Sequence, residues 1–235
     1  MALQAACTNT GAAGQSNLSY GLASERDLDE AARIFVEQFP ERADRWFAKR
    51  SHALCFYRDL MELLWRMHGS TFYVARQAGA LRGYLVLTVP GRSLVRGMTS
   101  GTFFVRAAAH GISGRYGFRA LPKVVKELAG LGKSSQAEEV LAAPCVYVVA
   151  VASHSTGKGI GSRLLEDALR FCRGRFSAVW LNVEKENCGA IRIYERLGFR
   201  SIASDDTQFT MLCQLPAAAH QASQPTTGAS EGSRA

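Results

Sequence analysis

The sequence predicts one α/β domain in which helices flank a mixed β-sheet. Short β-branched and aromatic runs alternate with segments whose apolar residues recur at helical spacing. Of the 235 residues, 47% are hydrophobic, which suffices for one sizeable core. No apolar run reaches the ~18 residues that a membrane-spanning helix needs, so we expect no transmembrane segment.

The elements are expected in the order βααβββαβαβ. Ser24 is placed to cap a helix that runs to residue 38, and a second helical region covers residues 43–67. The turn residues 77–80 separate two strands and predict a hairpin. One domain over residues 17–215 accounts for the whole pattern. Its strands are expected at residues 18–22, 71–76, 81–89, 145–151, 178–183 and 209–215.

Both ends of the chain are rich in small and polar residues. Residues 1–16 and 216–235 have little to bury, and we expect both to be disordered. The six cysteines are scattered, with no Cys-x-x-Cys pair and no spacing typical of metal ligands. We therefore expect free thiols in a reducing, cytoplasmic compartment, and no bound metal.

A long insertion separates the third expected strand from the fourth. Residues 90–143 carry eight basic and three acidic side chains, a net charge of +5 out of the chain's +8, together with several aromatic residues. A hairpin would need only about 2–5 residues here. The insertion is consistent with weak contact to an anionic surface, with a helical lid, or with a homodimer contact. No nucleic-acid-binding module is recognised in the sequence, and we expect no nucleic-acid partner.

A glycine-rich turn follows the fourth expected strand. Residues 157–161 read Gly-Lys-Gly-Ile-Gly, and an amphipathic helix starts there. This order directs unpaired N–H groups and the positive end of a helix dipole at one point, which predicts a phosphate-binding site. The spacing fits neither a Walker loop nor a dinucleotide-binding fingerprint. The apolar stripe of the helix is expected to consist of Ile160, Leu164, Leu165, Ala168, Leu169 and Cys172.

A second block follows the fifth expected strand. Asn187, Ala190 and Tyr194 share one face of a helix, and Gly198-Phe199 stands where that helix should end. Together, the glycine turn and this block resemble the GNAT superfamily of acyl-CoA-dependent N-acetyltransferases over residues 144–204. The resemblance implies a mixed, splayed β-sheet flanked by helices, with the basic insertion between its third and fourth strands.

The resemblance also implies that acetyl-CoA is the acyl donor. The strands at 145–151 and 178–183 would splay apart, so that Val149 and Val151 pair with the pantetheine arm, and an N–H near Val149 or Ala150 polarises the thioester carbonyl. Thr156 stands where the family usually has Gln or Arg, which shortens one polar contact. Lys158 and Arg163 either add charge near the phosphates or are solvated cations. The N–H groups that would bind the pyrophosphate are those of Gly157, Lys158, Gly159, Ile160, Gly161 and Ser162.

By the same resemblance, Asn187 contacts the pantetheine region and Tyr194 donates a proton to the departing thiolate. From spacing alone, Tyr194 also fits a core tyrosine with a hydrogen-bonded hydroxyl. For the general base, Glu184 is the nearest acidic residue, since residues 146–151 contain no carboxylate; a surface position in a polar turn is the alternative. Tyr147, His154 or a chain of water molecules are further options, and an acceptor amine of low pKa needs no base.

The sequence thus predicts an enzyme that transfers an acetyl group from acetyl-CoA to a primary amine of a small metabolite, an amino sugar or a protein. Two other functions fit the same residues. One is a non-catalytic module that binds acyl-CoA. The other is an acyltransferase that uses the basic insertion to associate with a membrane surface.

Overall fold

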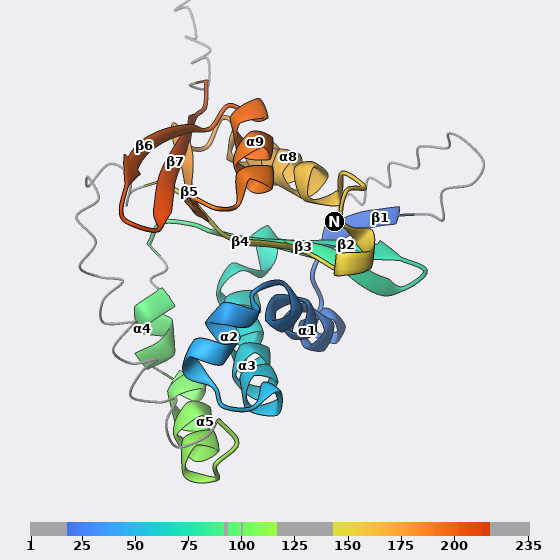
Figure 1. Cartoon of the computed structure of the whole chain (residues 1–235), viewed down its shortest axis with the longest axis vertical. Coiled ribbons are helices and arrows are strands. Elements are labelled where there is room, and N and C mark those ends of the chain that lie inside the picture. Colours follow the sequence, from blue (N-terminus) through green and yellow to red (C-terminus); the bar gives the residue numbers. More distant parts are fainter. Residues whose placement is uncertain (1–17, 92–93, 100, 117–142, 217–235) are drawn as a thin grey trace, which may run out of the picture.

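The computed structural model describes residues 18–91, 94–99, 101–116 and 143–216. Its strands form one seven-stranded sheet in the order β1-β2-β3-β4-β5-β7-β6 (Figure 1). Neighbouring strands are antiparallel except for β4 and β5, which are parallel. The mixed sheet is therefore confirmed. The strands are β1 (Leu18–Leu22), β2 (Phe72–Gln77), β3 (Ala80–Thr88), β4 (Cys145–Val151), β5 (Ala178–Glu184), β6 (Arg200–Ser204) and β7 (Gln208–Gln214).

Helices cover both faces of this sheet (Figure 1). One face packs against α1 (Leu28–Gln38), α2 (Pro40–Trp46) and α3 (Arg50–His68), and the described part of the insertion, α4 (Leu94–Thr99) and α5 (Gly101–Ile112), lies against α3. The other face packs against α8 (Ile160–Cys172) and α9 (Cys188–Arg196). No helix among the described residues has the length and apolar character needed to cross a bilayer.

The two faces have separate hydrophobic cores, and β3 contributes to both. Tyr84 and Val86 point into the core beneath α1 and α3, whereas Leu85 and Leu87 point into the core beneath α8. This alternation is the period of two that a strand buried on both faces must have. The expected apolar stripe of α8 is confirmed residue by residue, because all six of its members are buried.

The hairpin between β2 and β3 is also confirmed. Gln77 pairs with Ala80, so that the loop is only Ala78 and Gly79. Both loop residues have left-handed backbone, with φ of 51° and 80°. Two consecutive positive φ values are typical of a type I′ turn, whose twist matches that of the flanking strands.

The structure corrects two expectations about the elements. The helical region expected at residues 43–67 is two helices, because Phe47 is extended and only 4% exposed, with its ring 5.2 Å from that of Phe56. Strand β6 was not expected. All five of its residues are exposed, so it has no apolar alternation to mark it, and it exists through its pairing with β7. Disorder was expected at residues 1–16 and 216–235, and these residues lie outside the described part of the chain, except for residue 216. Residues 117–142 of the insertion lie outside it as well.

The start of α1 is fixed by a buried carboxylate. Ser24, which was expected to cap a helix, is the N-cap of a 3₁₀ turn (Glu25–Asp27) that leads into α1, and its N–H and Oγ both donate to Asp27 Oδ2 at 2.7 Å. Arg76 Nε on β2 donates to Asp27 Oδ1 at 2.8 Å. Burial by itself raises the pKa of Asp27, but the hydrogen bonds from Arg76 and Ser24 outweigh it and hold the pKa below its usual range.

Asp27 should therefore make stability depend on pH. Because its folded-state pKa lies below the unfolded value of ~3.9, its contribution is fully present above that value and is lost as the pH falls towards the folded pKa. We expect Asp27→Asn to cost about 1–3 kcal/mol at neutral pH in urea unfolding, and the gap to the wild type to shrink in acid. The control Asp29→Asn changes a side chain that is 70% exposed and should cost less than ~1 kcal/mol. A pH-independent gap for Asp27→Asn would contradict this account.

Candidate active site

The glycine-rich turn brings the start of α8 next to the end of β4. After Val151 the chain makes a 3₁₀ turn at Ser153–Ser155 and then passes two glycines with left-handed backbone, φ +80° at Gly157 and +75° at Gly159. Residues with a side chain rarely adopt this conformation, so these two positions require glycine. Gly159 is the N-cap of α8.

The start of α8 carries a row of backbone N–H groups that have no acceptor among the described residues. The first backbone hydrogen bond of α8 that reaches back into the turn is from Arg163 N–H to Gly159 O, at 3.0 Å. Within the described residues, the N–H groups from Gly157 to Ser162 have no hydrogen-bond acceptor, and no side chain caps the helix. Together with the helix dipole, these donors form the kind of site that binds phosphate.

The side chains of the turn contribute unequally. Thr156 and Lys158 are exposed and Ser162 is half-buried, so all three are accessible to a ligand. Ile160 is only 1% exposed and packs in the core, so it can offer only its N–H. A Cβ at Gly161 would lie 3.6 Å from Val151 Cγ2, an ordinary contact, which means that bulk at Gly161 points towards β4.

Strands β4 and β5 splay apart, as the sequence led us to expect. Their only register pair in the described sheet is Cys145 with Trp180, and Trp180 N–H donates to Pro144 O at 3.0 Å. On its other edge β4 stays paired with β3 along its whole length, apart from a bulge at Tyr147. From residue 146 onward, β4 therefore has one paired edge and one open edge.

The direction of the backbone groups on β4 follows from its pairing with β3. Ala152 N–H donates to Arg82 O at 2.9 Å, so residues 148, 150 and 152 direct their backbone groups at β3. Because the direction alternates along a strand, Val149 and Val151 direct theirs at the open edge. Of the two N–H groups that the sequence left open, the geometry thus favours Val149 over Ala150.

Helix α9 and its N-cap carry Asn187 and Tyr194, the two residues of the second block to which the resemblance assigns roles. Asn187 is its N-cap, and Oδ1 accepts from Ala190 N–H at 3.1 Å. At the other end, Gly198 has φ +93°, and Phe199 N–H donates to Tyr194 O at 3.0 Å, the pattern of a Schellman cap. The C-terminal glycine expected from the sequence is therefore confirmed.

Tyr194 packs into the same core as Val149 and Val151, with its ring 5.9 Å from that of Phe199. The side chain is half-buried, and burial raises the pKa of its phenol to about 12. Among the described residues, no group forms a hydrogen bond with its hydroxyl. Within this part of the chain, Tyr194 therefore presents a protonated phenol that is free to donate.

Glu184 lies at the end of β5 and forms an ion pair with Arg42 of α2. Its Oε1 is 3.3 Å from Arg42 Nη2, and both side chains are about half exposed (50% and 45%). The ion pair connects α2, on one face of the sheet, to the end of β5. His154 of the turn contacts Arg82 on β3.

Arg42 and Tyr84, which the sequence did not single out, both lie near Tyr147. Tyr84 is fully buried, yet its hydroxyl has no hydrogen-bond partner among the described residues. Burial, reinforced by the nearby Tyr147 and Tyr57, holds the pKa of Tyr84 far above its usual value. Burial likewise raises the pKa of Tyr147, and nearby Arg42 lowers it in part. Neither Arg42 nor Tyr84 lies in a motif, so only the folded chain shows that both lie near Tyr147.

The family model for GNAT acetyltransferases matches residues 28–199, which is more than half of the chain. The chain belongs to the GNAT acetyltransferase family. The resemblance drawn from the glycine turn and the second block is thereby confirmed, and so is the fold that it implied.

Curated relatives of this GNAT protein include two mycothiol acetyltransferases. The one from Parafrankia sp. (strain EAN1pec) is 46% identical over 61 residues, which are 26% of this chain and 19% of that protein. The one from Rhodococcus opacus (strain B4) is 41% identical over 61 residues, 26% of this chain and 20% of that protein. The match therefore spans about a fifth of the length of these relatives.

Solved structures resemble this GNAT fold over most of the chain. SsHAT superposes with a TM-score of 0.65 at 18% identity, covering 84% of this chain and 98% of that one. A histone acetyltransferase HPA2 and related acetyltransferase from Corynebacterium glutamicum has a TM-score of 0.53 at 21% identity, covering 85% and 97%. The PaiA N-acetyltransferase from Thermoplasma acidophilum, solved in complex with coenzyme A, has a TM-score of 0.50 at 15% identity, covering 84% and 99%.

Proposed function

We propose that this GNAT protein transfers an acetyl group from acetyl-CoA to a primary amine of a small metabolite, an amino sugar or a protein. The observation that carries the proposal is the row of unpaired N–H groups from Gly157 to Ser162, which lies beside the open edge of β4. A donor with a pyrophosphate and an amide-containing arm needs these two features side by side.

In the proposed complex, the turn holds the donor mainly through its backbone. The N–H groups of residues 157–162 bind the pyrophosphate, while the side chains of Thr156, Lys158 and Ser162 are within reach of the phosphates. Val149 and Val151 pair with the amide groups of the pantetheine arm as a neighbouring strand would. The N–H of Val149 donates to the thioester carbonyl and stabilises the oxyanion. Asn187 contacts the arm through its amide nitrogen, since its Oδ1 caps α9.

The proposed reaction is direct attack of the acceptor nitrogen on the thioester carbon. A C–N bond forms and the C–S bond breaks, so the amine must lose one proton and the sulfur must gain one. Tyr194 donates its phenolic proton to the departing thiolate. Glu184 takes the proton of the amine, directly or through water, and Arg42 holds its carboxylate in place.

Arg42, Tyr147 and Glu184, whose side chains are partly exposed, form the proposed acceptor side. They combine a cation, a carboxylate and a phenol, which suits an acceptor that carries hydroxyl groups beside its amine. Because curated relatives are named mycothiol acetyltransferases, an acceptor panel should begin with amines related to mycothiol and continue with amino sugars, polyamines and peptide N-termini.

Acetyl-CoA should stabilise the purified protein against heat. At ~100 times its dissociation constant, a ligand of the folded state adds about 2.7 kcal/mol, a shift of several degrees in Tm. Gly161→Glu should abolish the shift, because it places a negative charge at the donors that bind the pyrophosphate. Gly161→Gln is the matched control of the same size without the charge, and Gly161→Ala should keep the full shift, since its Cβ makes only ordinary contacts.

An assay of CoA release, run with the thermal-shift experiment, separates the enzyme from a non-catalytic acyl-CoA-binding module. Both bind the donor, but only the enzyme releases free CoA when an amine is supplied. Failure of any acyl-CoA to raise Tm would contradict the donor site, as would a shift in Gly161→Glu as large as that in Gly161→Ala. A shift without CoA release across the whole acceptor panel would favour the binding module.

A further inference from the structure

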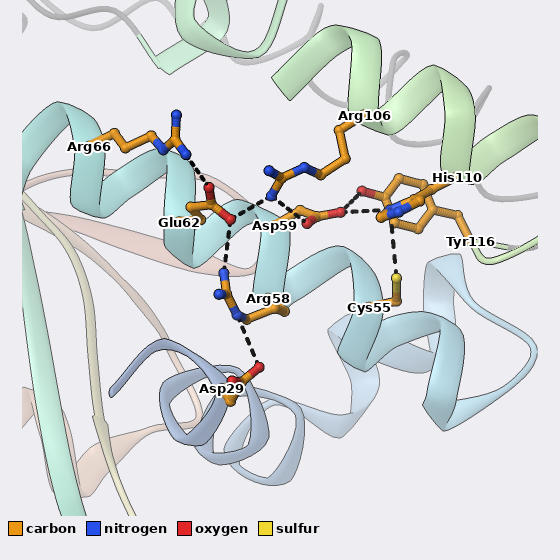
Figure 2. Close-up of polar contacts among 9 residues, drawn as sticks. All are labelled: Asp29, Cys55, Arg58, Asp59, Glu62, Arg66, Arg106, His110 and Tyr116. Atoms are coloured by element: carbon orange, nitrogen blue, oxygen red, sulfur yellow. Dashed lines mark hydrogen bonds and ion pairs between the residues drawn. The ribbon is translucent and has the colours of Figure 1, made fainter. Parts of the chain in front are cut away.

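A second polar cluster lies outside the candidate active site, where the insertion meets α3 (Figure 2). Cys55 and Asp59 are one helical turn apart on α3, so their side chains share a face. His110 of α5 points between them: its Nδ1 is 3.7 Å from Cys55 Sγ and 2.9 Å from Asp59 Oδ2. Among the described residues, these three form the one group of Cys, His and acidic side chains whose ligand atoms all lie within 4.8 Å of one another.

The three atoms have the chemistry and the spacing of a transition-metal site. Thiolate sulfur, imidazole nitrogen and carboxylate oxygen are the ligand types that Zn²⁺ takes, at about 2.3, 2.0 and 2.1 Å. Around a tetrahedral ion, those bond lengths place the ligand atoms roughly 3.4–3.6 Å apart. The S–N distance already agrees, at 3.7 Å. The N–O pair, at 2.9 Å, must open by about 0.5 Å, and the S–O pair, which lies within 4.8 Å, must close by about 1.2 Å at most.

The hydrogen bonds of Asp59 are compatible with a metal on Oδ2. Arg106 Nη1 is 3.3 Å from the other oxygen, Oδ1, and can keep this contact while Oδ2 binds an ion. The Tyr116 hydroxyl donates to Oδ2 and would use the second lone pair of that oxygen. Outer partners of this kind orient ligating carboxylates in metal sites. His110 is neutral when it binds through Nδ1, and its side chain is 18% exposed, which leaves a path from solvent.

We propose that Cys55, Asp59 and His110 form a three-ligand site for a divalent transition-metal ion of the Zn²⁺ type, with water as the fourth ligand. On binding, the Cys55 thiol releases its proton to solvent, and the proton of the neutral His110 ring moves from Nδ1 to Nε2. The ion then fastens α5, one of the two described helices of the insertion, to α3. Its role is structural, because its ligands lie on α3 and α5, whereas the candidate donor site is formed by β4, α8 and α9. No spacing typical of metal ligands marks this site in the sequence, because Cys55 and His110 are 55 residues apart.

The test is a Co²⁺ titration of the full, untagged chain after treatment with a chelator, followed by absorption spectroscopy. We expect a thiolate-to-cobalt charge-transfer band with the d–d bands of a four-coordinate ion, saturating at one equivalent and displaced by Zn²⁺. Cys55→Ser should abolish the charge-transfer band. The matched control Cys188→Ser, which changes an exposed cysteine on the opposite side of the sheet, should leave it unchanged.

A second pair of variants guards against misfolding. Tyr116→Phe keeps the ring and removes only the outer hydrogen bond, and it should weaken Co²⁺ binding by about 10–100-fold. His110→Ala should weaken it further, with unchanged far-UV circular dichroism. A wild-type chain that binds no Co²⁺, or a charge-transfer band that survives Cys55→Ser, would overturn the site and leave the cluster as a purely polar contact between α3 and α5. The result is independent of acetyl-CoA, so it does not depend on the proposed activity.

Discussion

Replacing Tyr194 with Phe is expected to lower kcat by about 10²–10⁴-fold, the usual range for removal of a proton donor. The ring packing on Phe199 is kept, so the thermal shift with acetyl-CoA should be the same as in the wild type. Burial raises the pKa of Tyr194 to about 12, and the phenol therefore stays protonated across neutral and mildly alkaline pH. The rate of CoA release with a working acceptor, measured against pH, checks both points.

A matched control is available in Tyr73 on β2. Burial raises its pKa to about 12 as well, but it lies away from the open edge of β4, so Tyr73→Phe should leave kcat unchanged. If Tyr194→Phe were as active as Tyr73→Phe, the proton for the thiolate would have to come from water or another residue. A loss of acetyl-CoA binding in Tyr194→Phe would instead assign the residue to donor binding.

The largest loss of stability is expected from Glu62→Gln. The Glu62 carboxylate is almost buried (7% exposed) and accepts hydrogen bonds from Arg58 at 3.0 Å, from Arg66 at 2.6 Å and from Arg106 (Figure 2). Burial raises its pKa, but the arginines, Arg106 foremost, outweigh this and lower it below the usual range. Removing the charge leaves three guanidinium groups around a neutral amide, and we expect a cost of about 2–4 kcal/mol in urea unfolding.

Arg66→Gln provides the comparison for this prediction. It removes one arm of the same network from a side chain that is 53% exposed, where an ion pair contributes little, so it should cost less than ~1 kcal/mol. Similar losses for the two variants would mean that Glu62 is solvated in solution and that α5 is not held by this network.

The parts of the fold that depend on local pattern could be predicted from the sequence. The buried stripe of α8 follows from helical spacing alone, and the end of α9 follows from the glycine at Gly198. The N-cap role of Asn187 was not predicted and comes from the structure. The glycine-rich turn was equally visible, because Gly157 and Gly159 mark backbone that other residues avoid.

What could not be predicted depends on contacts between distant segments. The run from Val146 to Val151 is apolar throughout, so the sequence does not show which residues face which core, nor that the strand bulges at Tyr147. The break before α3 arises because Phe47 is buried against aromatic rings. Arg42 meets Glu184 across 142 positions of the chain, and no periodicity connects them.

The separation of β4 from β5 has a consequence for the dynamics of the sheet. The amides of Val149 and Val151 belong to a central strand, yet they lack the cross-strand partner that protects central amides from hydrogen exchange. Without donor they should exchange with solvent about as fast as those of an outermost strand, although they lie in the middle of the order β1 to β6. A bound donor would supply hydrogen-bond partners to the open edge of β4 and slow that exchange. The substrate would then take the place of a neighbouring strand.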